Sequence, residues 1–338
     1  MKIRNLWPRL RAKTSRGGPR GPLIFVYNNI YWMIPLQSHV FSPKKYRLLY
    51  EEVIRLGIKK NQLILSRLAT YEELCLVHTE KYLKKIFQGD LSSSEVQRLE
   101  IPFTPEIKEF SLLTVGGTIQ AAEWALKTGI AVHLGGGFHH AFPDHGEGFC
   151  LLNDIAVAVE KLLQEKKISK AMIIDLDVHQ GNGTAFIFAH RSEVFTFSLH
   201  QMDLYPAQKE KSTLDVGLWS GDGDLVYLQA LKAHFPRIVD EFRPEILFYL
   251  AGADPFARDQ LGGLKLTKNA LQERDRLIIF ETRKRQIPLA ILLGGGYAFD
   301  VNDTVDIHLQ TIKIARQTTR PWPLFRRKKS YFSKDQKS

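Results

Sequence analysis

Five short islands of polar or glycine-rich sequence interrupt this chain, and each carries residues that could do chemistry. Two adjacent histidines, His139 and His140, follow three glycines. The run 175–179 alternates Asp, Asp and His, so these side chains share one face of an extended segment. The other islands are residues 198–200, 251–254 and 294–297. Together the first two supply both parts of a hydrolytic site: ligands for a divalent metal and imidazoles that move the protons of a metal-bound water.

The run 175–179 and the island at 251–254 predict a site for one divalent metal. Asp177, His179 and Asp254 would provide two carboxylates and one imidazole, which leaves an open position as in a catalytic zinc site. The residues around this run are apolar, and burying two Asp without a cation would be costly. For the run alone, a solvated strand end is the alternative. Zinc is the expected ion, although such a site also accepts ferrous iron.

The paired histidines predict proton transfer, because an imidazole near its ordinary pKa both accepts and returns protons. After three glycines, His139 and His140 are expected in a turn that lets both rings face the strand ends. Asp175 and Asn182 are candidate partners that would fix their tautomers. Tyr297 also follows three glycines, and a phenol beside a metal can stabilise an oxyanion. A tyrosine packed in a glycine-rich turn is the alternative interpretation.

The islands follow short apolar runs, and from Gly129 onward these runs alternate with helical patterns. The predicted strands are 23–27, 130–134, 171–176, 194–199, 246–250 and 289–293. The predicted helices are 43–56, 69–87, 110–127, 153–166, 225–242 and 267–286. Strands that are apolar on both faces indicate a parallel sheet covered on both sides. Since ligands bind at the carboxyl ends of such strands, the islands are expected to converge on one site.

The charge is concentrated at the two ends of the chain. Residues 1–22 contain seven Lys or Arg and no acid, and residues 316–338 contain eight Lys or Arg and one Asp. Taking +7 for each end from the net charge of +11 leaves −3 for the body. No linker or repeat divides residues 23–315, so we predict one catalytic domain between two basic tails. The tails could contact nucleic acid or an acidic partner, or be solvated ends only; the first could be a transit peptide.

The cysteine content and the hydropathy bear on the compartment. Cys75 and Cys150 are the only cysteines among 338 residues, which favours a reducing compartment. No apolar run approaches the ~18 residues of a membrane span, and the N-terminus lacks the apolar region of a secretory signal. We expect an intracellular protein, cytoplasmic by preference, with a nucleus or an organelle as alternatives.

Taken together, the islands resemble the zinc-dependent histone deacetylases and their bacterial relatives. The motifs are GGGFHHAFPDHGEGFCLLND, IIDLDVHQGNGT, FSLH, LAGADPF followed by DQLGGLKLT, and LLGGGYA. The resemblance covers roughly residues 23–315, and the segments 39–46 and 180–183 look most like the class IV branch and compact bacterial homologues. It implies the arginase/deacetylase fold, a single three-layer α/β/α domain with an eight-stranded parallel sheet.

The resemblance also implies roles for individual residues. The zinc ligands would be Asp177, His179 and Asp254. His139, paired with Asp175, would be the general base. His140, paired with Asn182, would protonate the leaving lysine amine, and Tyr297 would polarise the acyl carbonyl opposite the metal.

Two further sets of residues follow from the same resemblance. Gly148 and Phe149 would line a narrow channel for the lysine stem, with Tyr205 as a facing aromatic wall. Many family members also hold a structural monovalent cation. Here the resemblance implies such an ion, K⁺, bound by Asp175, Asp177, His179, Ser198 and Leu199.

Asn182 departs from several deacetylase classes, which have Asp at this position. A neutral amide favours an imidazolium less than a carboxylate does. We therefore expect His140 to be less basic than in Asp-bearing relatives.

The expected activity is removal of acetyl or longer acyl groups from lysine side chains of proteins by metal-activated water. One alternative is a deacetylase of small acetylated amines such as acetylpolyamines, for which Glu147 and Asp203 are candidate acids at the rim. Another is a scaffold or chromatin-binding protein with the same fold. Every residue expected to bind the metal or transfer protons is present in the sequence, which argues against a role as a scaffold without activity.

Overall fold

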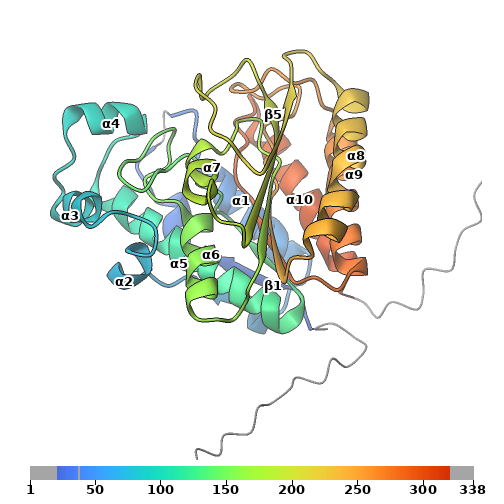
Figure 1. The fold of residues 1–338 in the computed structure, drawn as a ribbon, viewed down its shortest axis with the longest axis horizontal. Helices are drawn as coiled ribbons and strands as arrows, with labels where there is room; N and C mark the ends of the chain where they lie inside the picture. The colour runs from blue at the N-terminus through green and yellow to red at the C-terminus, as the bar shows by residue number, and fades with distance from the viewer. Residues whose placement is uncertain (1–20, 37–38, 320–338) are drawn as a thin grey trace, which may run out of the picture.

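A parallel sheet forms the centre of the protein, and helices cover both of its faces (Figure 1). The computed structural model describes residues 21–36 and 39–319. In this part the sheet has eight strands in the order β2-β1-β3-β8-β7-β4-β5-β6. The strands are β1 Ile24–Tyr27, β2 Leu63–Leu65, β3 Ile130–His133, β4 Ala171–Asp175, β5 Val194–Gln201, β6 Leu214–Leu218, β7 Ile246–Leu250 and β8 Leu289–Leu292. The predicted single domain with three layers and an eight-stranded parallel sheet is confirmed.

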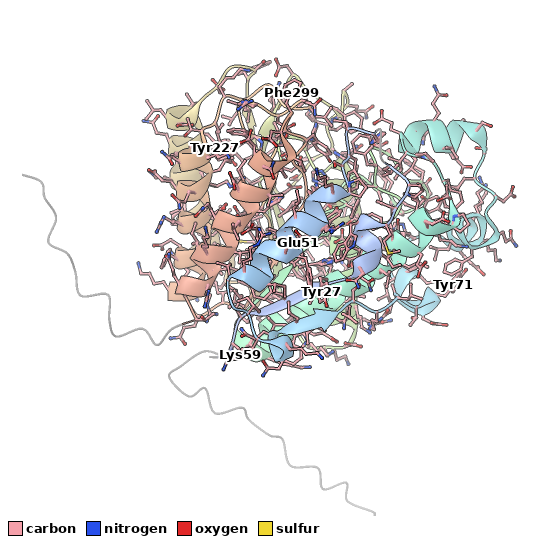
Figure 2. The ribbon with its side chains drawn as sticks, turned by 180° about the vertical axis from the view of Figure 1, so that it is seen from behind. Tyr27, Glu51, Lys59, Tyr71, Tyr227 and Phe299 are labelled. Carbon is pink, nitrogen blue, oxygen red and sulfur yellow. The ribbon has the colours of Figure 1, made fainter. Side chains whose placement is uncertain are left out.

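Two helical layers enclose the sheet. The α-helices are α1 Lys44–Arg55, α2 Tyr71–Leu74, α3 Glu80–Gln88, α4 Ser93–Leu99, α5 Pro105–Thr128, α6 Asp154–Gln164, α7 Asn182–Phe188, α8 Asp224–Phe242, α9 Lys268–Lys284 and α10 Val301–Gln317. One core cluster joins α5 and α6 to one face of the sheet, and a second joins α8, α9 and α10 to the other. Figure 2, seen from behind, shows α1 beside α10 in this second layer.

Strand β4 shows why the central runs are apolar throughout. Ala171 and Ile173 belong to the core cluster on the α5/α6 side, whereas Met172 and Ile174 belong to the opposite cluster. Successive side chains of a strand point to opposite faces, so a strand buried on both faces needs apolar residues at every position. The central strands were predictable for this reason.

One predicted helix is wrong. The pattern at 69–87 is not continuous, because the chain leaves the helical path after α2 and starts again at α3. Thr79 begins the second helix, and its hydroxyl accepts a hydrogen bond from the backbone N–H of Tyr82. The predicted end at Gly129 is confirmed: this glycine has φ +90° and ends α5.

The two predicted basic tails fall mainly outside the described residues, which begin at residue 21 and end at residue 319. Helix α10 continues to Gln317. Within the described residues, none of the helices has the length and hydropathy needed to cross a membrane.

Glu73 connects three elements outside the site and gives a test of stability. Its carboxylate accepts hydrogen bonds from the Arg67 guanidinium (2.6 and 2.7 Å) and from the Thr70 N–H (2.9 Å), and it pairs with Lys161 (3.0 Å). Burial alone would raise the pKa of Glu73, but these donors outweigh it and lower the pKa to about 2. We expect Glu73→Gln to reduce the free energy of unfolding at pH 7 by about 1–2 kcal/mol.

The pH dependence of this difference follows from the direction of the shift. A carboxylate with a lowered pKa in the folded state stabilises the protein above its ordinary pKa of 4.5, and this contribution is lost as the pH falls through about 2. Urea unfolding at several pH values should therefore show the wild type and Glu73→Gln converging in that window. Glu109→Gln, at an exposed position of α5, is the control. A difference that stays constant down to pH 2 would refute the assignment.

Candidate active site

Four neighbouring strands bring four of the five predicted islands together, whereas the fifth, residues 198–200, lies inside β5. Strands β3, β8, β7 and β4 are adjacent in the sheet, and the loops after their carboxyl ends carry the histidine pair, Tyr297, Asp254 and the run 175–179. A pocket of about 230 Å³ opens there. Its lining includes, among the predicted residues, His139, His140, Gly148, Phe149, Asp177, His179, Tyr205 and Tyr297.

Asp177, His179 and Asp254 form a buried group with the composition of a metal site. One ligand atom of each lies within 4.8 Å of the others. His179 Nδ1 is 2.9 Å from Asp177 Oδ1 and 3.8 Å from Asp254 Oδ2. Burial and the charge of Asp177 raise the pKa of Asp254 well above its ordinary value. In the described chain Asp254 Oδ2 is buried and has no hydrogen-bond partner, so this donor set fits a divalent cation that neutralises both carboxylates.

Gly295 keeps the space beside these carboxylates open. It has φ +62°, and a Cβ placed there would collide with the carboxylate oxygens of both Asp177 and Asp254. The glycine run 294–296 therefore serves the ligand site as well as the turn before Tyr297.

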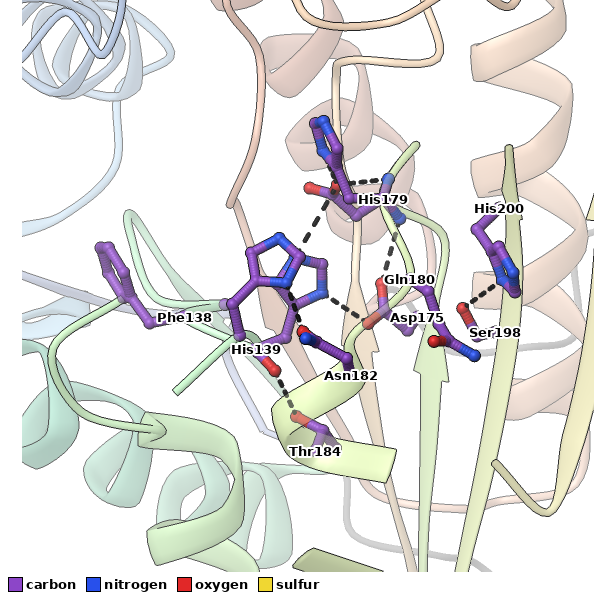
Figure 3. Close-up of polar contacts among 12 residues, drawn as sticks. Phe138, His139, Asp175, His179, Gln180, Asn182, Thr184, Ser198 and His200 are labelled. Carbon is purple, nitrogen blue, oxygen red and sulfur yellow. Dashed lines mark hydrogen bonds and ion pairs between the residues drawn. The ribbon is translucent and has the colours of Figure 1, made fainter. Parts of the chain in front are cut away.

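The histidine pair lies in a turn and not in a strand, as predicted (Figure 3). The ring centroids of His139 and His140 are 4.1 Å apart. His139 Nδ1 lies 2.7 Å from Asp175 Oδ2, and His140 Nδ1 lies 2.7 Å from Asn182 Oδ1. Since each Nδ1–H donates to its oxygen partner, Nε2 of each ring is the atom available for proton transfer.

The two rings have different basicities for identifiable reasons. Burial lowers the pKa of His139, but the negative charges of Asp175 and Asp177 outweigh burial and raise the pKa to about 9. Burial lowers the pKa of His140 well below its ordinary value, and the neighbouring rings His139 and His179 lower it further. In the metal-free site His139 is therefore the protonated ring at neutral pH and His140 the neutral one. A cation on Asp177 would offset part of the charge that raises the pKa of His139, which would allow this ring to act as a base.

Tyr297 is held by groups on both sides of its backbone. The Asp259 carboxylate accepts a hydrogen bond from the Tyr297 N–H at 2.6 Å, and the Lys45 ammonium donates to the Gly295 carbonyl at 2.5 Å. The Tyr297 ring packs against Phe149, with centroids 5.9 Å apart. Burial, followed by the charges of Asp177 and Asp254, raises the pKa of the Tyr297 hydroxyl well above its ordinary value, so it keeps its proton.

Comparison with known proteins identifies the family. A family model described as the histone deacetylase domain matches residues 39–312. The chain belongs to the histone deacetylase family. Histone deacetylase 2 of Arabidopsis thaliana is 30% identical over 301 residues, which cover 85% of this chain and 78% of that protein. The acetoin utilization protein AcuC of Bacillus subtilis is 30% identical over 279 residues, covering 75% of this chain and 72% of that protein.

Two other matches cover most of the chain. An uncharacterized protein of Picosynechococcus is 39% identical over 292 residues, with 86% of this chain and 97% of that protein covered. The crystal structure of an HDAC homologue from Aquifex aeolicus superposes with a TM-score of 0.73 at 26% identity, covering 87% of this chain and 84% of that chain. Membership makes this protein a hydrolase of a metal-dependent deacetylase family, and the predicted fold is that of the family. Its place in class IV stays a prediction.

Other predicted residues of this deacetylase-family protein lie at the pocket or beside it. The Tyr205 ring is 5.0 Å from the His140 ring. Ser198, predicted to bind a monovalent cation, pairs in register with Asp175, and its hydroxyl is 2.9 Å from His200 Nδ1. The structure therefore places Ser198 next to the buried carboxylates, and the monovalent cation stays a prediction.

Several residues that support the site were not predicted. Besides Lys45 and Asp259, the carboxylate of Asp154 accepts hydrogen bonds from the N–H groups of Gly137 (3.0 Å) and Phe138 (2.7 Å). Asp154 thereby fixes the turn just before the histidine pair. All three residues lie in the segments that carry the family resemblance, but no pattern in the sequence assigned them a role. Lys45 and Asp154 stand near helix starts, where a charged residue is typically solvated.

The position of Asn182 gives a sharper form of the expectation about His140. The Asn182 amide accepts from His140 and donates to Glu147 Oε1 at 2.6 Å, and Glu147 also accepts from the Tyr205 hydroxyl at 2.9 Å. A carboxylate at 182 would raise the pKa of His140, but it would also face Glu147 and share a proton with it. We expect Asn182→Asp to move the basic limb of the pH–rate profile to higher pH, and Asn182→Asp/Glu147→Gln to move it further. Superimposable profiles would contradict the expectation.

Proposed function

We propose that this protein is a zinc-dependent hydrolase that removes acetyl or longer acyl groups from lysine side chains of proteins. One observation carries the proposal. A buried Asp–His–Asp group, two histidines with separate partners and a protonated tyrosine surround one pocket. Ferrous iron is the alternative ion for the same ligands. A structural K⁺ near Asp175 and Ser198 is part of the proposal.

The residues divide the chemistry between them. A divalent ion held by Asp177, His179 and Asp254 would supply Lewis-acid activation of the acyl carbonyl and of water. His139 Nε2 accepts the proton of the attacking water, and the Asp175 carboxylate stabilises the resulting imidazolium. His140, which is neutral at rest, takes up the second proton of the attacking water at Nε2 and delivers it to the departing lysine amine. The Tyr297 hydroxyl donates a hydrogen bond to the oxygen of the former carbonyl.

The shape of the entrance agrees with a lysine side chain. Gly148, with φ +53°, leaves no bulk beside His140 and Tyr205, and Phe149 packs near Tyr297. Aromatic rings and a glycine suit an aliphatic stem, whose amine must reach His140. Glycine at 148 is needed because a Cβ would lie 2.9 Å from the His140 ring.

The alternative substrate is a small acetylated amine such as an acetylpolyamine. A neighbouring hollow is lined by three acids, Glu100, Glu147 and Glu210, together with Arg98. Glu147 already accepts hydrogen bonds from Asn182 and Tyr205, which favours a role in the wall over a role in binding a second ammonium. The other proposed rim acid, Asp203, is exposed and accepts from Gln201. Acylated lysine in a protein therefore stays the first proposal.

Hydrolysis of acylated lysine peptides tests the proposal. Metal-loaded protein is assayed with acetyl- and myristoyl-lysine peptides and with acetylspermidine, and His140→Ala is the inactive control. Turnover of peptides that a chelator abolishes and added Zn²⁺ restores would support the proposal, and the preferred chain length would define the acyl group. Faster turnover of acetylspermidine than of the peptides would make a small acetylated amine the proposed substrate. No turnover by protein shown to contain metal would refute the activity.

A further inference from the structure

Helix α9 carries two ionisable side chains inside the core. Arg274 and Asp275 have no exposed surface, whereas their neighbours Glu273 and Arg276 on the same helix are exposed. Moving a guanidinium out of water costs several kcal/mol unless its donors are paired. The partners of Arg274 therefore indicate what this buried cation does.

The guanidinium of Arg274 is fixed on two sides. Nη1 donates a hydrogen bond to the Gly252 carbonyl at 2.6 Å and a longer one to the Leu176 carbonyl at 3.4 Å. Nε and Nη2 contact Asp275 Oδ1 at 2.9 and 2.8 Å. Asp275 is itself held by the hydroxyl groups of Tyr249 and Thr311, each at 2.5 Å. With so many fixed partners, Arg274 has one orientation.

Both carbonyls belong to the loops that carry the proposed metal ligands. Leu176 directly precedes Asp177, and Gly252 is two residues before Asp254. These loops follow the adjacent strands β4 and β7. Arg274 is not part of the pocket lining, so it acts on the ligands only through the backbone.

We propose that Arg274 is a positioning residue for the metal site, which sets the spacing of the Asp177 and Asp254 carboxylates by binding one backbone carbonyl in each loop. The inference rests on the proposed function, because it assumes that these carboxylates bind a metal. Metal affinity depends on ligands held in place before the ion arrives, and groups that orient the ligands contribute strongly.

A role in stability alone would not explain this arrangement. A buried ion pair is often replaceable by apolar side chains of similar volume without loss of stability. A planar guanidinium, unlike an apolar side chain or an ammonium, can bind two carbonyls and a carboxylate at once from a rigid fork of donors. The contacts of Arg274 use this property at the two loops that contain the metal ligands.

The test measures Co²⁺ binding to Arg274→Lys. Lysine keeps the positive charge beside Asp275 but replaces the fork by a single ammonium. The affinity for Co²⁺ is measured by competition with a chelator, the visible absorption band of the bound ion reports its geometry, and thermal unfolding of the metal-free protein reports the fold. We expect Co²⁺ to bind roughly 10–100-fold more weakly, with an altered band. Arg276→Lys, at an exposed position of the same helix, should match the wild type.

A folded Arg274→Lys protein with wild-type affinity and an unchanged band would overturn the proposal. If this variant does not fold, Arg274→Met/Asp275→Asn, which removes both buried charges, takes its place with the same criteria. Failure of both variants to fold would show a structural role and would also overturn it. The wild type is measured first: if it does not bind Co²⁺, the proposed function fails, whereas retained binding in Arg274→Lys contradicts the role of Arg274 alone.

Discussion

Asp254→Asn is expected to abolish metal binding and hydrolysis together while leaving the metal-free protein at least as stable as the wild type. The loss of activity follows because one of two anionic ligands is removed, and metal activation contributes several kcal/mol, or roughly 10³-fold in rate. The gain in stability follows from the electrostatics of the metal-free site. Burial and Asp177 raise the pKa of Asp254, so its ionised form opposes folding at neutral pH. Asparagine keeps the oxygen that accepts from the Val178 N–H.

Thermal unfolding with and without Zn²⁺ separates these effects. The wild type should be stabilised by the ion, by about 2.7 kcal/mol at a concentration 100 times the dissociation constant, whereas Asp254→Asn should not respond. Asp306→Asn, at an exposed site on α10, should respond like the wild type. A normal response of Asp254→Asn to Zn²⁺ would mean that the ion binds elsewhere.

The buried strands and the ligand-bearing loops were predictable because their signals are local. Strand β7 was predicted with its observed bounds, since every residue from Ile246 to Leu250 is apolar and buried. The two edge strands, β2 and β6, were not predicted. Their residues are largely half-buried or exposed, which gives a weak pattern. Helix α10 was not predicted either, although Asp300 caps it and apolar residues recur along it at helical spacing.

The residues of the site also divide into those with a local signal in the sequence and those without one. Asp177 and His179 are two residues apart, and their spacing predicted that they would lie together. The structure brings them together in a bend just beyond the end of β4, and not along the strand itself. Sequence could not reveal that Arg274, about a hundred residues away, binds the carbonyl of Leu176. On its helix Arg274 stands among charged residues, and such a run is usually solvated. Only the packing of α9 against the sheet shows that this one cation is buried.

Tyr297→Phe is expected to lower kcat by about 10²–10³-fold with little change in KM or in metal affinity. The substitution removes one hydrogen-bond donor and keeps the ring, which packs against Phe149 and Phe41. A donor that acts on the developing oxyanion affects the transition state and not the bound substrate. The matched control is Tyr205→Phe, which loses a hydroxyl bonded to Glu147 and should lower kcat much less.

The pH dependence distinguishes a hydrogen-bond donor from a proton donor or base. The raised pKa of Tyr297 keeps its hydroxyl protonated through the neutral range, so Tyr297 does not titrate where the histidines do. The ratio of wild-type to Tyr297→Phe kcat should therefore be constant between about pH 6 and pH 9, while the shape of each profile is set by His139 and His140. A ratio that collapses toward one at either end of this range would show that the phenol transfers a proton. Its role would then be acid–base catalysis, and the loop held by Lys45 and Asp259 would have to place it against the leaving group and not against the carbonyl.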